Sequence, residues 1–118
     1  MSQSRIDIFA EMAREQPDSE MVWYGLANEY VKAERWGEAA DALRQVVSLN
    51  PDYTAAYQLL GTALFEQGES EQARVIWEQG REVAERTGAW KARQHIEGLL
   101  ARMDEGPKGK RDSEFCEE

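Results

Sequence analysis

Residues 18–51 read DSEMVWYGLANEYVKAERWGEAADALRQVVSLNP, and residues 52–85 repeat the same pattern. A shift of 34 residues places Pro17 on Pro51, Trp23 on Tyr57 and Leu26 on Leu60. The same shift aligns Ala27 with Gly61, Tyr30 with Leu64, Ala39 with Ala73 and Leu43 with Trp77. Self-similarity at a fixed period of this length indicates a stack of repeated units, each of which buries its apolar face against its neighbours.

The residue types within one copy indicate paired helices. Trp23, Leu26, Ala27 and Tyr30 recur at helical spacing, so they lie along one side of a helix and form a buried stripe. The small residue at Ala27, like its counterpart in the second copy, lets a neighbouring helix approach closely. A large side chain at this position would cost about 1 to 3 kcal/mol through overpacking.

The combination of a large aromatic residue, a leucine followed by a small residue, and a second helix opened by alanine resembles the tetratricopeptide repeat. The resemblance implies an all-α fold, an α-solenoid of antiparallel helix pairs. The turn inside each pair matches the family in part. Glu34 stands where the family usually has glycine, whereas Trp36 keeps the usual aromatic residue. The second copy has Gly68 but carries Ser70 in place of the aromatic residue.

We expect one tetratricopeptide-repeat domain over residues 1–105. Its predicted units are a half-repeat helix at 5–16, a first repeat at 20–53, a second repeat at 54–87 and a capping helix at 89–104. The predicted breaks between them are Pro17, the segment 50–52, and Thr87 with Gly88. Residues 106–118 combine glycine, proline, lysine and acidic residues, so a disordered tail is expected there.

The two terminal helices are expected to cover the ends of the stack. The apolar residues of segment 5–16 are Ile6, Ile8, Phe9, Met12 and Ala13. Those of segment 89–104 are Ala89, Ala92, Ile96, Leu99 and Met103, and this segment lacks the leucine-small signature. Both sets follow a helical rather than an alternating period, which favours one buried stripe on each helix.

The composition disfavours several classes of partner. The net charge of -9 opposes a sequence-independent grip on nucleic acid phosphates or on an anionic membrane. Residues 1–80 carry 6 basic and 14 acidic side chains, a net charge of -8, so a basic segment of a partner would be attracted to this part of the chain. Charged helical surfaces in general would give the same bias. The lone Cys116 and the absence of a signal-peptide pattern make a cytoplasmic location the expectation.

Candidate catalytic and metal-binding residues are scarce, so we expect no enzyme activity, cofactor or metal. His95 is the only histidine, and Cys116 lies among acidic residues that oppose thiolate formation. Trp23 and Trp77 occupy core positions of the repeat and Trp36 occupies a turn, which favours packing over a ligand cage. Only Trp90 has no assigned role.

In the family, the first helix of each pair lines a concave groove that holds a segment of another protein. The residues that would face this groove are Met21, Tyr24, Asn28, Val31 and Lys32 in the first copy, and Ala55, Gln58, Thr62, Phe65 and Glu66 in the second. These positions would also be the exposed or half-buried remainder of two helices that bind nothing. One subtype clamps the C-terminal carboxylate of chaperone tails. Asn28 matches one clamp position, but Tyr24 and Leu59 stand where a lysine and an asparagine are needed, which argues against that ligand.

The sequence therefore predicts a non-catalytic module that binds another protein or peptide through the concave face. The alternative is a structural subunit that associates with copies of itself. We expect neither nucleic acid nor a membrane as partner.

Overall fold

The computed structural model describes residues 2–111, and the side chains of residues 5–103. Within these residues the chain forms six α-helices and no strand, as predicted. The helices are α1 (Ser2–Glu15), α2 (Glu20–Lys32), α3 (Trp36–Leu49), α4 (Thr54–Glu66), α5 (Ser70–Thr87) and α6 (Trp90–Arg111). The all-α solenoid of helix pairs is thus confirmed.

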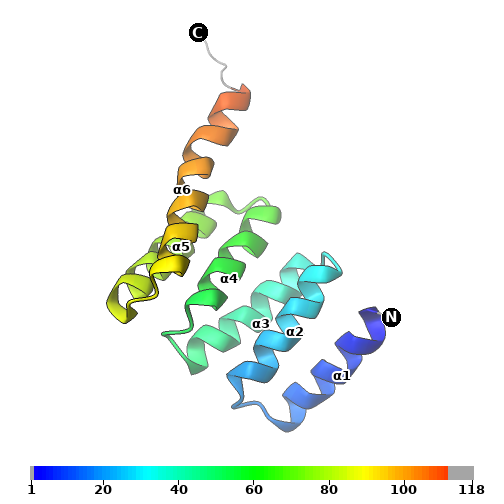
Figure 1. The fold of residues 1–118 in the computed structure, drawn as a ribbon. Coiled ribbons are helices and arrows are strands. Elements are labelled where there is room, and N and C mark those ends of the chain that lie inside the picture. Colours follow the sequence, from blue (N-terminus) through cyan, green and yellow to red (C-terminus); the bar gives the residue numbers. More distant parts are fainter. Residues whose placement is uncertain (1, 112–118) are drawn as a thin grey trace.

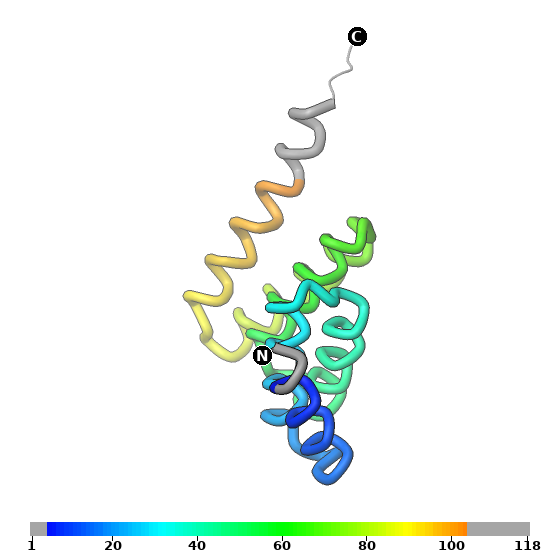
Figure 2. The backbone as a smooth tube through the Cα atoms, turned by 90° about the vertical axis from the view of Figure 1, so that its right-hand side faces the viewer, coloured from blue at the N-terminus to red at the C-terminus, as the bar shows by residue number. Residues whose placement is uncertain are grey.

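The helices stack in chain order, and each packs chiefly against its neighbours in sequence. Figure 1 shows α1 and α6 at opposite ends, with the hairpins α2–α3 and α4–α5 between them. In Figure 2, α3 forms one side and α6 the other, with α2 between them. The principal extents are 55 × 34 × 18 Å, so the shortest dimension corresponds to two helix layers of about 10 Å each.

The two repeats anchor their first helices in the same way. The Trp23 Nε1–H group donates a hydrogen bond of 2.9 Å to the carbonyl oxygen of Pro17. At the equivalent position, the Tyr57 hydroxyl donates one of 2.8 Å to the carbonyl oxygen of Pro51. Each aromatic residue therefore ties its helix to the proline that ends the preceding unit, although one uses an indole and the other a phenol.

The small residues lie in the core, as the sequence predicts. Ala27, Ala39 and Ala73 are fully buried. The Trp77 indole packs directly against Gly61. A side chain at residue 61 has no room, because a Cβ atom there would lie 2.1 Å from the Trp77 Nε1 atom. Trp77 itself is only 3% exposed and donates from Nε1 to the carbonyl oxygen of Gln58 at 3.1 Å. The core position predicted for Trp77 is therefore confirmed.

Three details differ from the sequence prediction. Ile8 is 57% exposed, because the side of α1 that packs against α2 carries Ile6 and Ala13 instead. Leu100 is buried in the main core although the predicted stripe of the last helix omitted it. Helix α6 also continues to Arg111, so residues 106–111 are helical rather than disordered. Residues 112–118 lie outside the described residues.

Candidate functional site

Eight residues, which we call the first-helix face, are the predicted partner-binding set. They are Met21, Tyr24, Asn28, Val31 and Lys32 on α2, and Gln58, Thr62 and Phe65 on α4. Met21 is the most accessible of the large apolar residues in the set, with 74% of its surface exposed. Tyr24 and Asn28 are partly buried. The structure thus places an accessible apolar side chain next to two anchored polar ones along α2.

Tyr24 forms an aromatic pair with Tyr53, the residue that precedes α4. The ring centroids are 5.0 Å apart and the ring planes are inclined by 36°. Both rings are partly buried against the main core. Burial raises the pKa of the Tyr53 hydroxyl, and Tyr24 and the Glu20 carboxylate raise it further. The pair therefore joins the first helices of two successive repeats at a point that keeps some exposed ring surface.

Sequence reasoning missed Tyr53. It is the residue just before α4, and its side chain makes no capping hydrogen bond to that helix. Its contact is with the preceding repeat, and the periodicity of a single helix does not reveal contacts between helices. An aromatic residue directly after a Pro-Asp break was the only available signal.

The remaining residues of the first-helix face on α2 are held by the protein itself. The Asn28 Nδ2–H group donates a hydrogen bond of 2.9 Å to the carbonyl oxygen of Tyr24. The Lys32 Nζ atom lies 3.4 Å from Glu29 Oε2. Val31 packs against the main core. Asn28 is therefore positioned by Tyr24, its neighbour on the predicted face, whereas Val31 and Lys32 contribute to the fold.

The α4 part of the first-helix face is more constrained. The Gln58 Nε2–H group donates to the carbonyl oxygen of Ala92 on α6 at 3.4 Å, so α6 approaches α4 at this point. The Thr62 hydroxyl donates to the carbonyl oxygen of Gln58 at 3.0 Å. Phe65 packs on Trp77 with ring centroids 6.0 Å apart. These contacts make the α2 part, with Tyr53, the more open portion of the predicted face.

A carboxylate that the sequence analysis did not identify is buried between α1 and α2. The Glu29 residue is 3% exposed. Its Oε1 atom faces the Arg5 Nε atom at 3.2 Å, and its Oε2 atom faces Lys32. Arg5 is the largest influence and lowers the pKa of Glu29, against the opposing effect of burial. Glu29 therefore holds the half-repeat helix to the first repeat as an ionised group.

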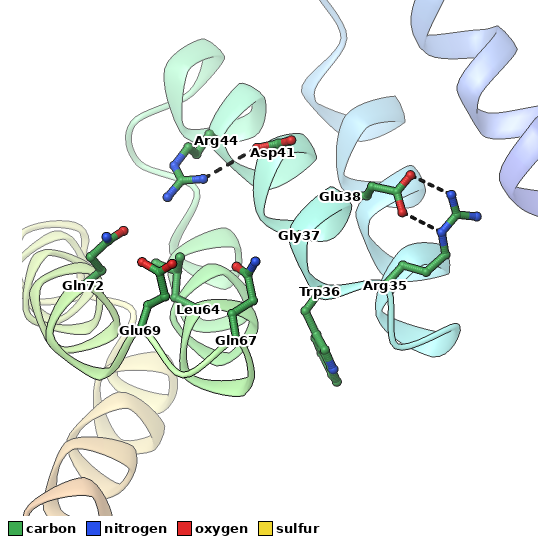
Figure 3. Close-up of a pocket in the computed structure, with 10 residues that line it drawn as sticks. All are labelled: Arg35, Trp36, Gly37, Glu38, Asp41, Arg44, Leu64, Gln67, Glu69 and Gln72. Carbon is green, nitrogen blue, oxygen red and sulfur yellow. Dashed lines mark hydrogen bonds and ion pairs between the residues drawn. The ribbon is translucent and has the colours of Figure 1, made fainter.

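A second surface lies on the opposite helix layer. Two adjoining cavities of about 600 and 290 Å³ form what we call the α3–α5 furrow. Its lining residues are Arg35, Trp36, Gly37, Glu38, Asp41, Arg44, Leu64, Gln67, Glu69, Glu71, Gln72, Val75 and Ile76. In Figure 3, Asp41 and Arg44 stand on the α3 side, across the opening from Glu69 and Gln72 at the start of α5.

On the α3 side of the α3–α5 furrow, the charged side chains pair with one another. The guanidinium of Arg35 makes two hydrogen bonds of 2.6 Å to the Glu38 carboxylate, and Arg44 lies 3.7 Å from Asp41 (Figure 3). Pairs between exposed side chains of this kind stabilise a helix only slightly. The furrow residues come from α3, α4, α5 and the turns beside them, so no local sequence pattern could have revealed the furrow.

Among the described residues, no group of three or more histidine, cysteine, aspartate or glutamate side chains could hold a metal ion. None of the helices in the described part of the chain is long and apolar enough to cross a membrane. His95 is exposed on α6.

Comparison with known proteins gives consistent matches. Residues 30–103 match the family model described as Tetratricopeptide repeat. TPR repeat-containing protein PA0015 of Pseudomonas aeruginosa is 30% identical over 99 residues, which cover 84% of this chain and 94% of that protein.

Two solved structures share the fold of this chain, at sequence identities so low that the similarity concerns the fold alone. Protein BPP2914 from Bordetella parapertussis has a TM-score of 0.78 and 22% identity, with 95% of this chain and 96% of that chain covered. The TPR2B domain of yeast Sti1, solved in a complex with pHsp70, has a TM-score of 0.78 and 17% identity, with 85% and 80% covered.

Proposed function

Since this chain belongs to the tetratricopeptide-repeat family, we propose that it is a non-catalytic protein-interaction module that binds an extended or helical segment of a partner protein on the first-helix face. We place it in the cytoplasm. The proposed contact residues are centred on α2 and the start of α4, because α6 and Trp77 already engage the polar and aromatic residues further along α4.

The observation that carries the proposal is the Tyr24–Tyr53 pair, which links α2 to the start of α4 on the predicted face. Tyrosine combines a rigid apolar ring with a hydroxyl group, and such residues dominate the energetics of many protein interfaces. Met21 lies three residues before Tyr24 on the same helix and adds a flexible, exposed thioether. Asn28, one turn after Tyr24, can both donate and accept hydrogen bonds with a peptide backbone.

The fold similarity to the Sti1 domain supports a peptide-binding role, because that domain was solved in a complex with pHsp70. The ligand itself is not carried over. Tyr24 and Leu59 stand where the carboxylate-clamping subtype needs a lysine and an asparagine, so we expect a partner segment of different chemistry.

Mapping of a bound peptide tests the proposal. Peptides selected from a random displayed library are synthesised and titrated into the isotope-labelled chain, and backbone amide shifts are followed by NMR. We expect the shifted amides to cluster on α2 and at residues 53–58. Shifts confined to the α3–α5 furrow would move the binding site to the other layer and refute the proposed face.

Self-association is tested separately by light scattering across a dilution series. The interaction module predicts the mass of a monomer, 13.5 kDa, at every concentration. A dimer or larger species that dissociates on dilution would favour the structural alternative.

A further inference from the structure

We propose that the Tyr24–Tyr53 pair receives a lysine or arginine side chain of the partner segment, with Glu20 as the countercharge. This inference rests on the proposed function of the first-helix face and names the chemistry of its ligand. A cation is attracted to the face of an aromatic ring when it lies within about 6 Å of the centroid, and two tyrosine rings offer a larger target than one.

The two rings are available for such a contact. Elsewhere in the described residues, rings already carry a cation from this chain, with Arg35 lying 5.2 Å from the Tyr30 centroid and Lys91 lying 5.6 Å from the Trp90 centroid. Within the same part of the chain, no cation of the protein occupies the Tyr24 or Tyr53 ring. The Tyr24–Tyr53 pair therefore carries no cation from the described part of this chain, so a cation of the partner would meet no competitor there.

The surrounding charge favours a basic ligand. Glu20 lies one turn before Tyr24 on α2, and its negative charge raises the pKa of the Tyr53 hydroxyl. Its Oε2 atom accepts a hydrogen bond of 3.4 Å from the neutral Asn50 amide, and the described residues include no ion pair of Glu20.

The basic side chains on neighbouring elements are occupied elsewhere. Lys32 contacts Glu29, two turns further along α2, and Arg86 bonds to Asp52 at 2.8 Å. Glu20 is thus a negative charge beside two rings, in a segment of net charge -8. The exposed Met21 thioether can cover the aliphatic stem of a long basic side chain, which would otherwise stay in water.

The test uses a library-selected peptide whose affinity falls on Tyr24→Ala. Each arginine of the peptide is replaced by citrulline and each lysine by norleucine, which remove the charge and keep the aliphatic stem. One such replacement should weaken binding to the wild-type chain by about fivefold or more, the effect of losing one cation–ring contact. On Tyr24→Leu, the same replacement should weaken binding less than it does on the wild type, because only the Tyr53 ring and Glu20 remain to hold the cation.

Three further variants sharpen the result. Tyr24→Phe should bind like the wild type because it keeps the ring, and Glu20→Gln should reduce the effect of removing the cation. Trp90→Leu is the matched control at an exposed ring on α6, and it should leave the affinity lost on replacing the basic residue of the peptide unchanged.

The outcomes separate this inference from the proposed function. A Tyr24-dependent peptide that tolerates replacement of every basic residue, or that binds Tyr24→Leu as well as Tyr24→Phe, overturns the cation site and leaves the binding face intact. If no selected peptide depends on Tyr24, both the cation site and the proposed face are refuted.

Discussion

Glu34 and Gly68 adopt the same left-handed backbone conformation, with φ angles of 58° and 86°, at equivalent points of successive turns. The amide of Glu34 donates to the carbonyl of Val31, and that of Gly68 donates to the carbonyl of Phe65, the residue 34 positions after Val31. The repeat therefore imposes this conformation whichever residue occupies the position. Glycine adopts it without strain, but a residue with a Cβ atom does not.

The strain at Glu34 predicts that Glu34→Gly stabilises the protein. Relief of the left-handed conformation gains about 1 to 2 kcal/mol, and the greater freedom of glycine in the unfolded chain offsets part of it, so we expect a net gain of about 0.5 to 1 kcal/mol. Urea unfolding measures it. The matched control is Gly68→Ala, which should lose about 1 kcal/mol. No atom lies within 4 Å of the added Cβ there, so backbone strain alone would act. A loss of stability in Glu34→Gly would refute this account of the turn.

The contact of Gly61 with Trp77 predicts a compensating pair of substitutions. Gly61→Ala should destabilise the fold by about 1 to 3 kcal/mol, because the new Cβ atom collides with the indole. Trp77→Leu on the same background recreates the Ala27 and Leu43 pair of the first repeat and should recover part of the loss. A double-mutant cycle by thermal unfolding measures the coupling. Purely additive effects would show that the two residues do not share one space.

The buried Glu29 predicts a specific dependence of stability on pH. Its pKa is lowered in the folded state, chiefly by Arg5, so its stabilising contribution is complete above the ordinary glutamate pKa and is lost as the pH falls through the lower folded value. Unfolding free energies at about pH 7 and about pH 3 should therefore differ less in Glu29→Gln than in the wild type. Glu78→Gln, at an exposed glutamate of α5, is the control. An unchanged difference in Glu29→Gln would exclude the ion-paired role.

Much of the fold could be predicted because the repeat signature depends on residues that pack within one helix pair. The stripe at Leu26 and Ala27 and the core position of Trp77 follow from spacing alone. The end of α6 could not be predicted, because Gly106 and Pro107 signal a stop that the extended helix does not obey. The contacts between helices around the predicted face could be predicted less well than the fold. Contacts such as Tyr24 with Tyr53, or Gln58 with Ala92, join different helices, and no local pattern encodes them.

The most direct test of the central claim is the affinity of a library-selected peptide for two matched double variants, measured by fluorescence anisotropy. Tyr24→Ala with Asn28→Ala removes the open part of the first-helix face, whereas Gln72→Ala with Val75→Ala alters the α3–α5 furrow on the other layer. Circular dichroism confirms that both variants are folded. We predict that the first variant weakens binding by about 2 kcal/mol or more and that the second leaves it unchanged. Unchanged affinity in a folded Tyr24→Ala, Asn28→Ala variant would contradict the account.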